Sequence, residues 1–303
     1  MADKEELEAV SKLNEYYDSQ PKVLSIDTSA LSPAMNRRSL ATYIRELYSY
    51  RHFMYLHAKH RATADNDEMF LGRLWLLLEP VLRIAMYALV FGLILNTARA
   101  IENFLGFLII GVTFFSMLSK GLTGGSGILQ RSRALMRSFK FPRGTLVVSE
   151  SLRNFLGNLI PAILAVVAAV LFQWGTPLSP YLPLVIPLYI LAHFFTTGLM
   201  FIVARVTAFV PDARRVIAFV NRGWFYVSGV FFSVDRFVSV PTLQKVMMEN
   251  PAYLFLTAVR DSAIYGVPTT ADTWLRLVLW SFGTLTVGFI FFWRAENRYA
   301  HLR

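Results

Sequence analysis

The sequence has no cysteine, few charged residues and no apolar segment at its start. Because none of its 303 residues carries a thiol, disulfides, thiol nucleophiles and thiolate metal sites are excluded. Charged residues make up 17% of the chain, below the roughly 25% of soluble domains. Residues 1–10 are polar and acidic, so we expect no cleavable signal peptide. Since 55% of the residues are hydrophobic, the excess predicts lipid-facing surface.

Sequence patterns for catalysis are also missing. There is no Ser/His/Asp group at a recognisable elbow, no His-x-x-x-His pair and no nucleotide-binding motif. The Gly/Ser-rich passage 121–127 is not followed by Gly-Lys-Ser or Gly-Lys-Thr, which excludes a P-loop. Asp65 and Asp67 form an Asp-x-Asp pair, a pattern found in turns and helix starts and also in divalent-metal sites of sugar-nucleotide enzymes. We expect no catalytic residue, metal site or cofactor in this chain.

The net charge of +10 invites comparison with nucleic-acid-binding proteins. The cations, however, lie beside apolar segments rather than on an independent polar domain. This placement is typical of charges that set membrane topology. We therefore expect no nucleic-acid partner.

Six apolar segments have the composition of membrane spans. They are residues 74–95, 104–118, 145–174, 182–210, 216–232 and 274–293. The connections on one side are basic and those on the other are neutral or slightly acidic, which predicts that both termini lie in the cytoplasm. The sequence thus predicts an all-α integral membrane protein, with a cytoplasmic tail (1–42) and a six-span domain (43–303).

Residues 43–61 predict an amphipathic helix in the cytoplasmic membrane interface. Its apolar residues fall on one side of a helical wheel; they are Ile44, Leu47, Tyr48, Met54, Tyr55 and Ala58. Arg51 interrupts that side, and its long side chain can reach the headgroups. The alternative is an ordinary amphipathic helix that packs on a partner subunit.

Residues 234–272 form the longest predicted outer connection. The stretch 251–265 begins with proline and is followed by glycine, which predicts a helix with a defined start and stop. It is apolar enough to enter the membrane, but Arg260 and Asp261 prevent a full crossing. We therefore predict a re-entrant helical hairpin around residues 250–251.

The stretch 130–142 is short and basic, has no acidic residue, and separates two predicted spans. Leu135, Met136 and Phe139 have helical spacing, so the stretch predicts a short amphipathic helix that ends at Pro142. Such a helix either docks on a cytoplasmic partner or serves only as an orientation signal.

Glu150, Asn154 and Asn158 repeat every four residues in the third predicted span and so share one helix face. Polar groups at membrane depth must face protein or water. These three either line a polar path or join helices through hydrogen bonds. His193, alone on an apolar helix, is predicted to be structural. Because Glu79 and Glu150 both lie near the predicted inner side, a proton- or sodium-coupled carrier is disfavoured.

Several short motifs follow one another along the chain. They are Leu71-Gly72-Arg73-Leu74-Trp75, Glu79-Pro80, Tyr87 to Gly92, Leu135-Met136, Phe141-Pro142, Val210-Pro211-Asp212, Trp224-Phe225-Tyr226, Asn250-Pro251 and Val259-Arg260. Their order and spacing resemble the membrane subunits of ABC-2 type polysaccharide exporters, the permeases for O-antigen, capsule and teichoic acid. The resemblance covers residues 43–300, and it departs at 62–70, which is longer than the usual link before the Leu-Gly-x-x-Trp run.

This resemblance implies a homodimer in the bacterial cytoplasmic membrane, powered by two separate ABC ATPase subunits that bind ATP and Mg. It implies a lipid-linked glycan as substrate. Residues 130–142 resemble the coupling helix that docks on the ATPase, through Arg133, Leu135, Met136, Arg137, Phe139, Lys140 and Phe141. Residues 43–61 resemble a gate helix, whose candidates for headgroup contact, with one from the first span, are Arg45, Arg51, Tyr55, Lys59 and Arg83.

Within this scheme Glu150, Asn154 and Asn158 are the candidates for the transport path. Two alternatives stay open. One is the same fold exporting a lipid or a drug. The other is a polytopic glycosyl- or acyl-transferase that uses Asp65 and Asp67.

Overall fold

The computed structural model describes residues 8–12, 15, 39–64, 78, 81–82, 85–86, 89–90, 101–139, 141–173, 177–234 and 240–301. The chain divides into two units, residues 1–38 and residues 39–303. The described residues form helices, turns and loops, and none of them is in a β-strand. Several predicted features lie outside the described residues; they are most of the first span (74–95), Arg83, Asp65, Asp67 and Lys140.

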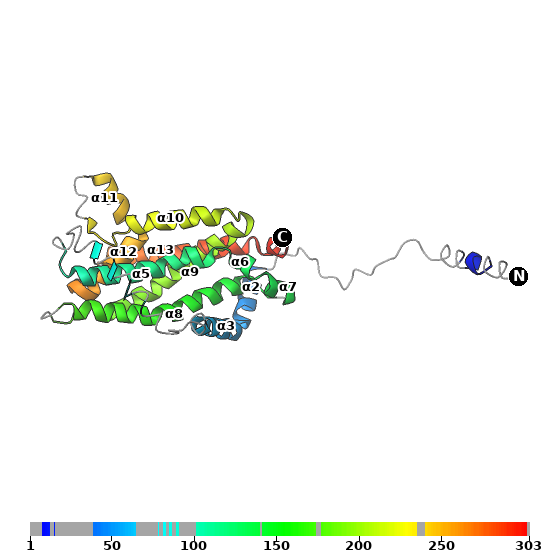
Figure 1. The fold of residues 1–303 in the computed structure, drawn as a ribbon, viewed down its shortest axis with the longest axis horizontal. Coiled ribbons are helices and arrows are strands. Elements are labelled where there is room, and N and C mark those ends of the chain that lie inside the picture. Colours follow the sequence, from blue (N-terminus) through cyan, green and yellow to red (C-terminus); the bar gives the residue numbers. More distant parts are fainter. Residues whose placement is uncertain are drawn as a thin grey trace. The chain divides into compact units, whose positions relative to one another are not determined.

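Within the described part, four helical segments are long and apolar enough to cross a membrane. They are α5 (Phe104–Gly125), α8 (Gly144–Leu171), α9 (Val185–Phe209) with the preceding 3-10 turn, and α13 (Ala271–Trp293). These helices run alongside one another (Figure 1) and correspond to the second, third, fourth and sixth predicted spans. In place of the fifth stands α10 (Ala213–Val227), with 15 residues, so the six-span count stays a prediction.

Shorter elements gather at the two ends of the bundle (Figure 1). One end, which we call the basic end, carries α2 (Leu40–Ser49), α3 (Arg51–Ala64), α6 (Ile128–Arg131), α7 (Arg133–Ser138) and the turn Glu296–His301. The other, which we call the hairpin end, carries α11 (Pro241–Met248), α12 (Pro251–Arg260) and the π turn Asp261–Tyr265. Hydrophobic clusters fill the bundle at both ends.

Residues 121–125 of the glycine-rich passage lie within α5, which continues to Gly125 rather than ending at Leu118 as predicted. Its glycines allow α5 to approach α9 closely. A Cβ atom on Gly121 would lie 2.9 Å from the carbonyl oxygen of Thr196, and one on Gly125 would lie 2.6 Å from that of Met200. The passage is therefore a helix-packing surface, which its composition alone does not distinguish from a loop.

The packing of α9 on α13 also depends on glycine. A Cβ atom on Gly288 would overlap the carbonyl group of Gly198, and one on Gly198 would overlap the backbone of Thr284. Small residues at such a contact allow two backbones to approach, which is how apolar helices gain packing energy where lipid is as apolar as the side chains.

The loop after α10 is held by Arg260, the last residue of α12. This side chain is buried and donates hydrogen bonds to the carbonyl oxygens of Phe107 (3.2 Å), Gly229 (2.9 Å) and Val230 (3.1 Å). Its guanidinium also lies 3.3 Å from the centroid of the Phe107 ring. One cation therefore supplies donors to two loop carbonyls, those of Gly229 and Val230, and adds a second hydrogen bond to the Phe107 carbonyl inside α5.

Asn250, which precedes α12, holds the same loop from the other side. Its Nδ2 donates to the carbonyl of Val227 at 3.2 Å, and its Oδ1 accepts from the indole Nε1 of Trp224 at 2.9 Å. The predicted helix 251–265 is confirmed as α12 followed by the π turn, which ends at Gly266 with a φ of 64°. Its re-entrant position in a membrane stays a prediction.

We expect Arg260→Met to lower the free energy of unfolding by about 3 kcal/mol or more, because it removes the donors of the Gly229 and Val230 carbonyls and the packing of the guanidinium on Phe107. Arg276→Met is the matched control, since Arg276 is half-exposed and pairs with Glu249 and Asp272 near the surface, where such pairs contribute about 1 kcal/mol or less. Denaturant titration in detergent measures both. Equal losses would contradict the role of Arg260.

We also expect Gly288→Ala to separate α9 from α13 and lower the melting temperature. Gly283→Ala is the control on the same helix, because a Cβ atom there meets nothing within 4 Å and alanine favours helix by up to about 1 kcal/mol. Thermal unfolding of both variants tests the contact, and the idea fails if the two behave alike.

Candidate functional site

The basic segment between α5 and α8 differs from the predicted single helix. Helix α7 ends at Ser138 rather than at Pro142, and Phe139 is extended, with φ −133° and ψ 139°. Phe141 is only 6% exposed, because it packs into the hydrophobic cluster of the basic end. The chain therefore leaves the helix at Phe139, two residues before the buried Phe141.

The candidate coupling residues fall into accessible and inaccessible groups. Phe139 is 63% exposed and Arg137 is also exposed, whereas Leu135 and Met136 are half-buried against the chain's own cluster. Arg133 is half-buried, and Lys140 lies outside the described residues. The surface that α7 and Phe139 offer to another protein is therefore carried by Arg137 and Phe139.

A groove of about 220 Å³ lies between this segment and the helix pair α2–α3. It is lined by Tyr50, Phe53, Leu135, Phe139 and Phe141. The rings of Phe53 and Phe141 lie 6.2 Å apart between their centroids. The two predicted cytoplasmic elements thus meet along an aromatic surface.

The predicted helix 43–61 consists of two helices that break at Tyr50. The Tyr50 ring lies 6.4 Å from that of Phe141 and packs against the basic-end cluster. Tyr43, Met54 and Ala58 are buried. The break allows Tyr50 to reach the basic-end cluster.

Of the other apolar residues predicted for this face, Leu47 is half-buried, and Ile44, Tyr48 and Tyr55 are exposed by 48%, 66% and 47%. Of the candidates for headgroup contact, Arg45, Arg51, Tyr55 and Lys59 are all exposed; they are accessible, as contact with a headgroup requires. The Arg51 guanidinium lies 4.7 Å from the centroid of the Tyr48 ring.

Tyr43 and Glu296 form a node that joins three parts of the basic end. The Tyr43 hydroxyl donates to Glu296 Oε2 at 2.9 Å and accepts from the Gly144 amide at 2.9 Å. Glu296 Oε1 accepts from the Arg143 amide at 2.7 Å. Burial, together with the Glu296 carboxylate, raises the pKa of Tyr43 above its ordinary value, so the phenol stays protonated and able to donate.

This node lies at the N-terminus of α8, directly after the basic segment. A carboxylate there is stabilised by free backbone amides and by the positive end of the helix dipole. It connects α2, the start of α8 and the C-terminal turn.

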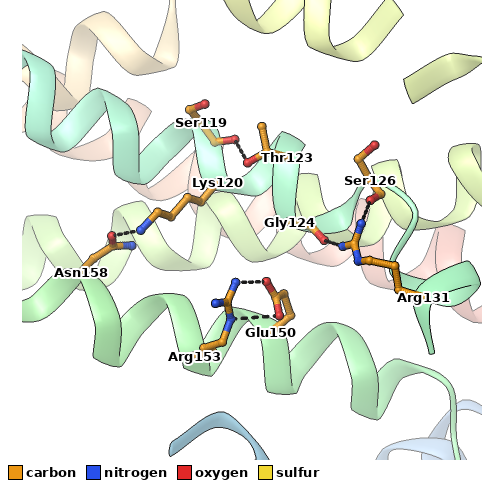
Figure 2. A network of polar contacts seen from close by, with 9 residues as sticks. All are labelled: Ser119, Lys120, Thr123, Gly124, Ser126, Arg131, Glu150, Arg153 and Asn158. Atoms are coloured by element: carbon orange, nitrogen blue, oxygen red, sulfur yellow. Dashed lines mark hydrogen bonds and ion pairs between the residues drawn. The ribbon is translucent and has the colours of Figure 1, made fainter. Parts of the chain in front are cut away.

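A second polar group, the polar seam, lies between α5 and α8 (Figure 2). Lys120 Nζ donates to Asn158 Oδ1 at 2.6 Å, and Arg153 pairs with Glu150 at 2.5 Å. Asn154 also faces α5, because a Cβ atom added to Gly124 of α5 would lie 3.3 Å from the Asn154 Nδ2. The structure therefore brings the three predicted path residues together and adds Lys120 opposite them.

Two hydrogen-bond donors of the polar seam have no acceptor within it. Glu150, Asn154 and Asn158 are all buried, and among the described residues neither Asn154 Nδ2 nor Asn158 Nδ2 has a hydrogen-bond acceptor.

His193 is packed against Phe155 and Tyr189, with ring centroids 4.9 and 4.5 Å away. It is buried in an aromatic setting, as a structural residue would be.

Sequence reasoning missed Lys120, Tyr43 and Glu296. Lys120 falls outside the second predicted span, which ends at Leu118, whereas α5 continues to Gly125; a cation inside an apolar helix is the signal that identifies it. No local signal identifies Tyr43 and Glu296, since their contact joins positions 253 residues apart.

Comparison with known proteins agrees with this architecture. The family model described as "ABC-2 type transporter" matches residues 67–264. The chain belongs to the ABC-2 type transporter family. It is 24% identical over 216 residues to the O-antigen export system permease protein RfbA of Myxococcus xanthus, covering 71% of this chain and 81% of that protein. The chain is therefore a membrane component of a transporter, and its family implies association with ABC ATPase subunits.

We expect Lys120 and Asn158 to be coupled energetically in this transporter. In a double-mutant cycle of Lys120→Met and Asn158→Leu, the interaction term should be about 1–3 kcal/mol, as for hydrogen bonds with one charged partner. Lys120→Met combined with Arg276→Met, at the hairpin end, should be additive. Unfolding titrations give the four free energies of each cycle, and additivity in the first cycle would exclude the contact.

Proposed function

We propose that this chain is the membrane subunit of an ATP-driven exporter that moves a lipid-linked polysaccharide across the bacterial cytoplasmic membrane. Family membership supports transport, and the O-antigen permease relative supports a glycan as substrate. The observation that carries the proposal is the exposed Phe139 on a basic segment. The end of this segment, at Arg143, is hydrogen-bonded through the Tyr43–Glu296 node to α2.

In this proposal Phe139 and Arg137 dock on the ATPase, and Arg133 and Lys140 orient the segment. Leu135, Met136 and Phe141 shape it from inside. The basic end then faces the cytoplasm, in agreement with the positive-inside rule. Besides those of α2 and α3, its arginines include Arg131, Arg133, Arg137, Arg143, Arg214, Arg215, Arg294 and Arg298.

The same proposal assigns α2 and α3 to the entrance. Arg45, Arg51 and Lys59 offer cations to a phosphate-containing headgroup, and Tyr55 offers a ring and a hydroxyl. Arg83 belongs to this set by its position in the sequence. The polar seam of Glu150, Asn154, Asn158 and Lys120 is proposed to line part of the path.

We propose further that two copies assemble side by side. The face of α10 supports this, because Val216, Phe219, Val220 and Tyr226 are exposed by 54% or more and no residue of α10 is buried. A second copy would cover this face.

The direct test is affinity purification of the tagged chain from native membranes, followed by transport in vesicles. The expected result is an ABC ATPase in equal amount and ATP-dependent movement of a lipid-linked glycan. ATP hydrolysis by the purified chain alone, or transport without the ATPase, would refute the proposal.

We expect Phe139→Asp to abolish transport-coupled ATP hydrolysis, because a charge replaces the exposed apolar contact. Phe172→Asp is the control, since Phe172 is 51% exposed at the opposite end of α8. ATPase activity of the reconstituted complexes measures coupling. Full coupling in the Phe139 variant would remove this residue from the interface.

We expect Tyr43→Phe to impair export while ATPase association is retained, because the variant loses both hydrogen bonds of the hydroxyl. Stability should fall by about 1–3 kcal/mol, the usual effect of leaving a buried partner unpaired. Tyr48→Phe, whose side chain is 66% exposed, controls for loss of a phenol. Normal export and stability in Tyr43→Phe would show that the node is dispensable.

A further inference from the structure

A groove at the hairpin end is separate from every site described above. It has a volume of about 610 Å³ and is lined by residues of α11, by the start of α12 and by Trp280 of α13. That volume lies in the range of small-molecule binding sites, about 300–1,000 Å³. Figure 1 shows α11 at the end of the bundle away from α2 and α7.

The rim of this groove carries charges of both signs. Lys245 and Glu249, four residues apart on and just after α11, both line it. Glu249 accepts from Arg276 at 2.9 Å, and Arg276 also pairs with Asp272 at 2.8 Å. One guanidinium is therefore shared by two carboxylates. Lys245 has no ion pair with another residue of the described part.

Below the rim, the groove is apolar. Trp280 follows Arg276 by one helical turn, about 6 Å along α13. Trp280 and Val246 are exposed by 40% and 58%, and Pro251 completes the wall. In a membrane protein, a charged rim at a helix end above an exposed tryptophan matches the order of headgroup and acyl chain in a lipid leaflet.

We propose that this groove binds a phospholipid with a zwitterionic amine headgroup. The lipid phosphate accepts hydrogen bonds from the Lys245 ammonium, and the lipid ammonium pairs with Glu249, whose Arg276 partner is already shared. The part of the acyl chain next to the headgroup packs on Trp280 and Val246. A purely anionic headgroup fits less well, because it has no cation to pair with Glu249, which shares its arginine partner with Asp272.

The test is native mass spectrometry of the full-length protein extracted from nanodiscs that hold equal amounts of phosphatidylethanolamine, phosphatidylglycerol and phosphatidylcholine. Wild type should retain phosphatidylethanolamine preferentially. Lys245→Ala should reduce that retention by about tenfold or more, since a charge-assisted hydrogen bond contributes that much. Lys245→Arg should preserve it, and Trp280→Ala should weaken it.

Arg222→Ala is the matched control, because Arg222 is an exposed cation on α10 that does not line the groove. Equal retention by wild type and Lys245→Ala overturns the site. Preference for phosphatidylglycerol overturns the zwitterionic assignment, and equal retention of phosphatidylcholine overturns the pairing of a protonated amine with Glu249. Displacement of the phospholipid by an added lipid-linked glycan at equal concentration overturns the choice of occupant.

Discussion

Arg260 and Asn250 satisfy the backbone at the point where the helical bundle becomes irregular. A carbonyl that is buried without a donor costs several kcal/mol, so an irregular turn inside the bundle must obtain donors from neighbouring side chains. Arg260 provides them to Phe107, Gly229 and Val230, and Asn250 provides one to Val227. With these carbonyls paired, α10 can end inside the bundle and two short helices can follow.

The basic end applies the same rule to a helix start. The first amides of α8 have no intrahelical acceptor, and Glu296 and Tyr43 accept from Arg143 and Gly144. These acceptors come from the C-terminal turn and from α2. The hydrogen bonds that satisfy the first amides of α8 therefore also join three distant parts of the chain. Removing either partner therefore affects more than a single bond.

Much of the fold could be predicted from the sequence, since lipid exposure leaves a readable pattern. The outer faces of α8 and α13 are apolar, with Ile160 and Leu279 exposed by 57% and 61%, and both spans were placed within a few residues. The end of α5, the break at Tyr50 and the end of α7 at Ser138 were missed. Each depends on a contact with a distant element, which local composition does not record. Lys120 was lost with the misplaced end of α5.

Helix α8 joins the two parts of the candidate site in one body. The node holds its first residue, and Glu150 follows six residues later, about 9 Å along the axis. A displacement of the basic segment therefore reaches the polar seam without an intervening loop. Further along, Pro161 lacks the amide that would bond to the Gly157 carbonyl, and a Cβ atom on Gly157 would meet nothing within 4 Å. Because this hydrogen bond is missing, α8 bends most easily near Gly157, between its polar first half and its apolar second half. In the proposed transport cycle, this point is where the polar half of α8 would tilt with the basic end relative to the apolar half.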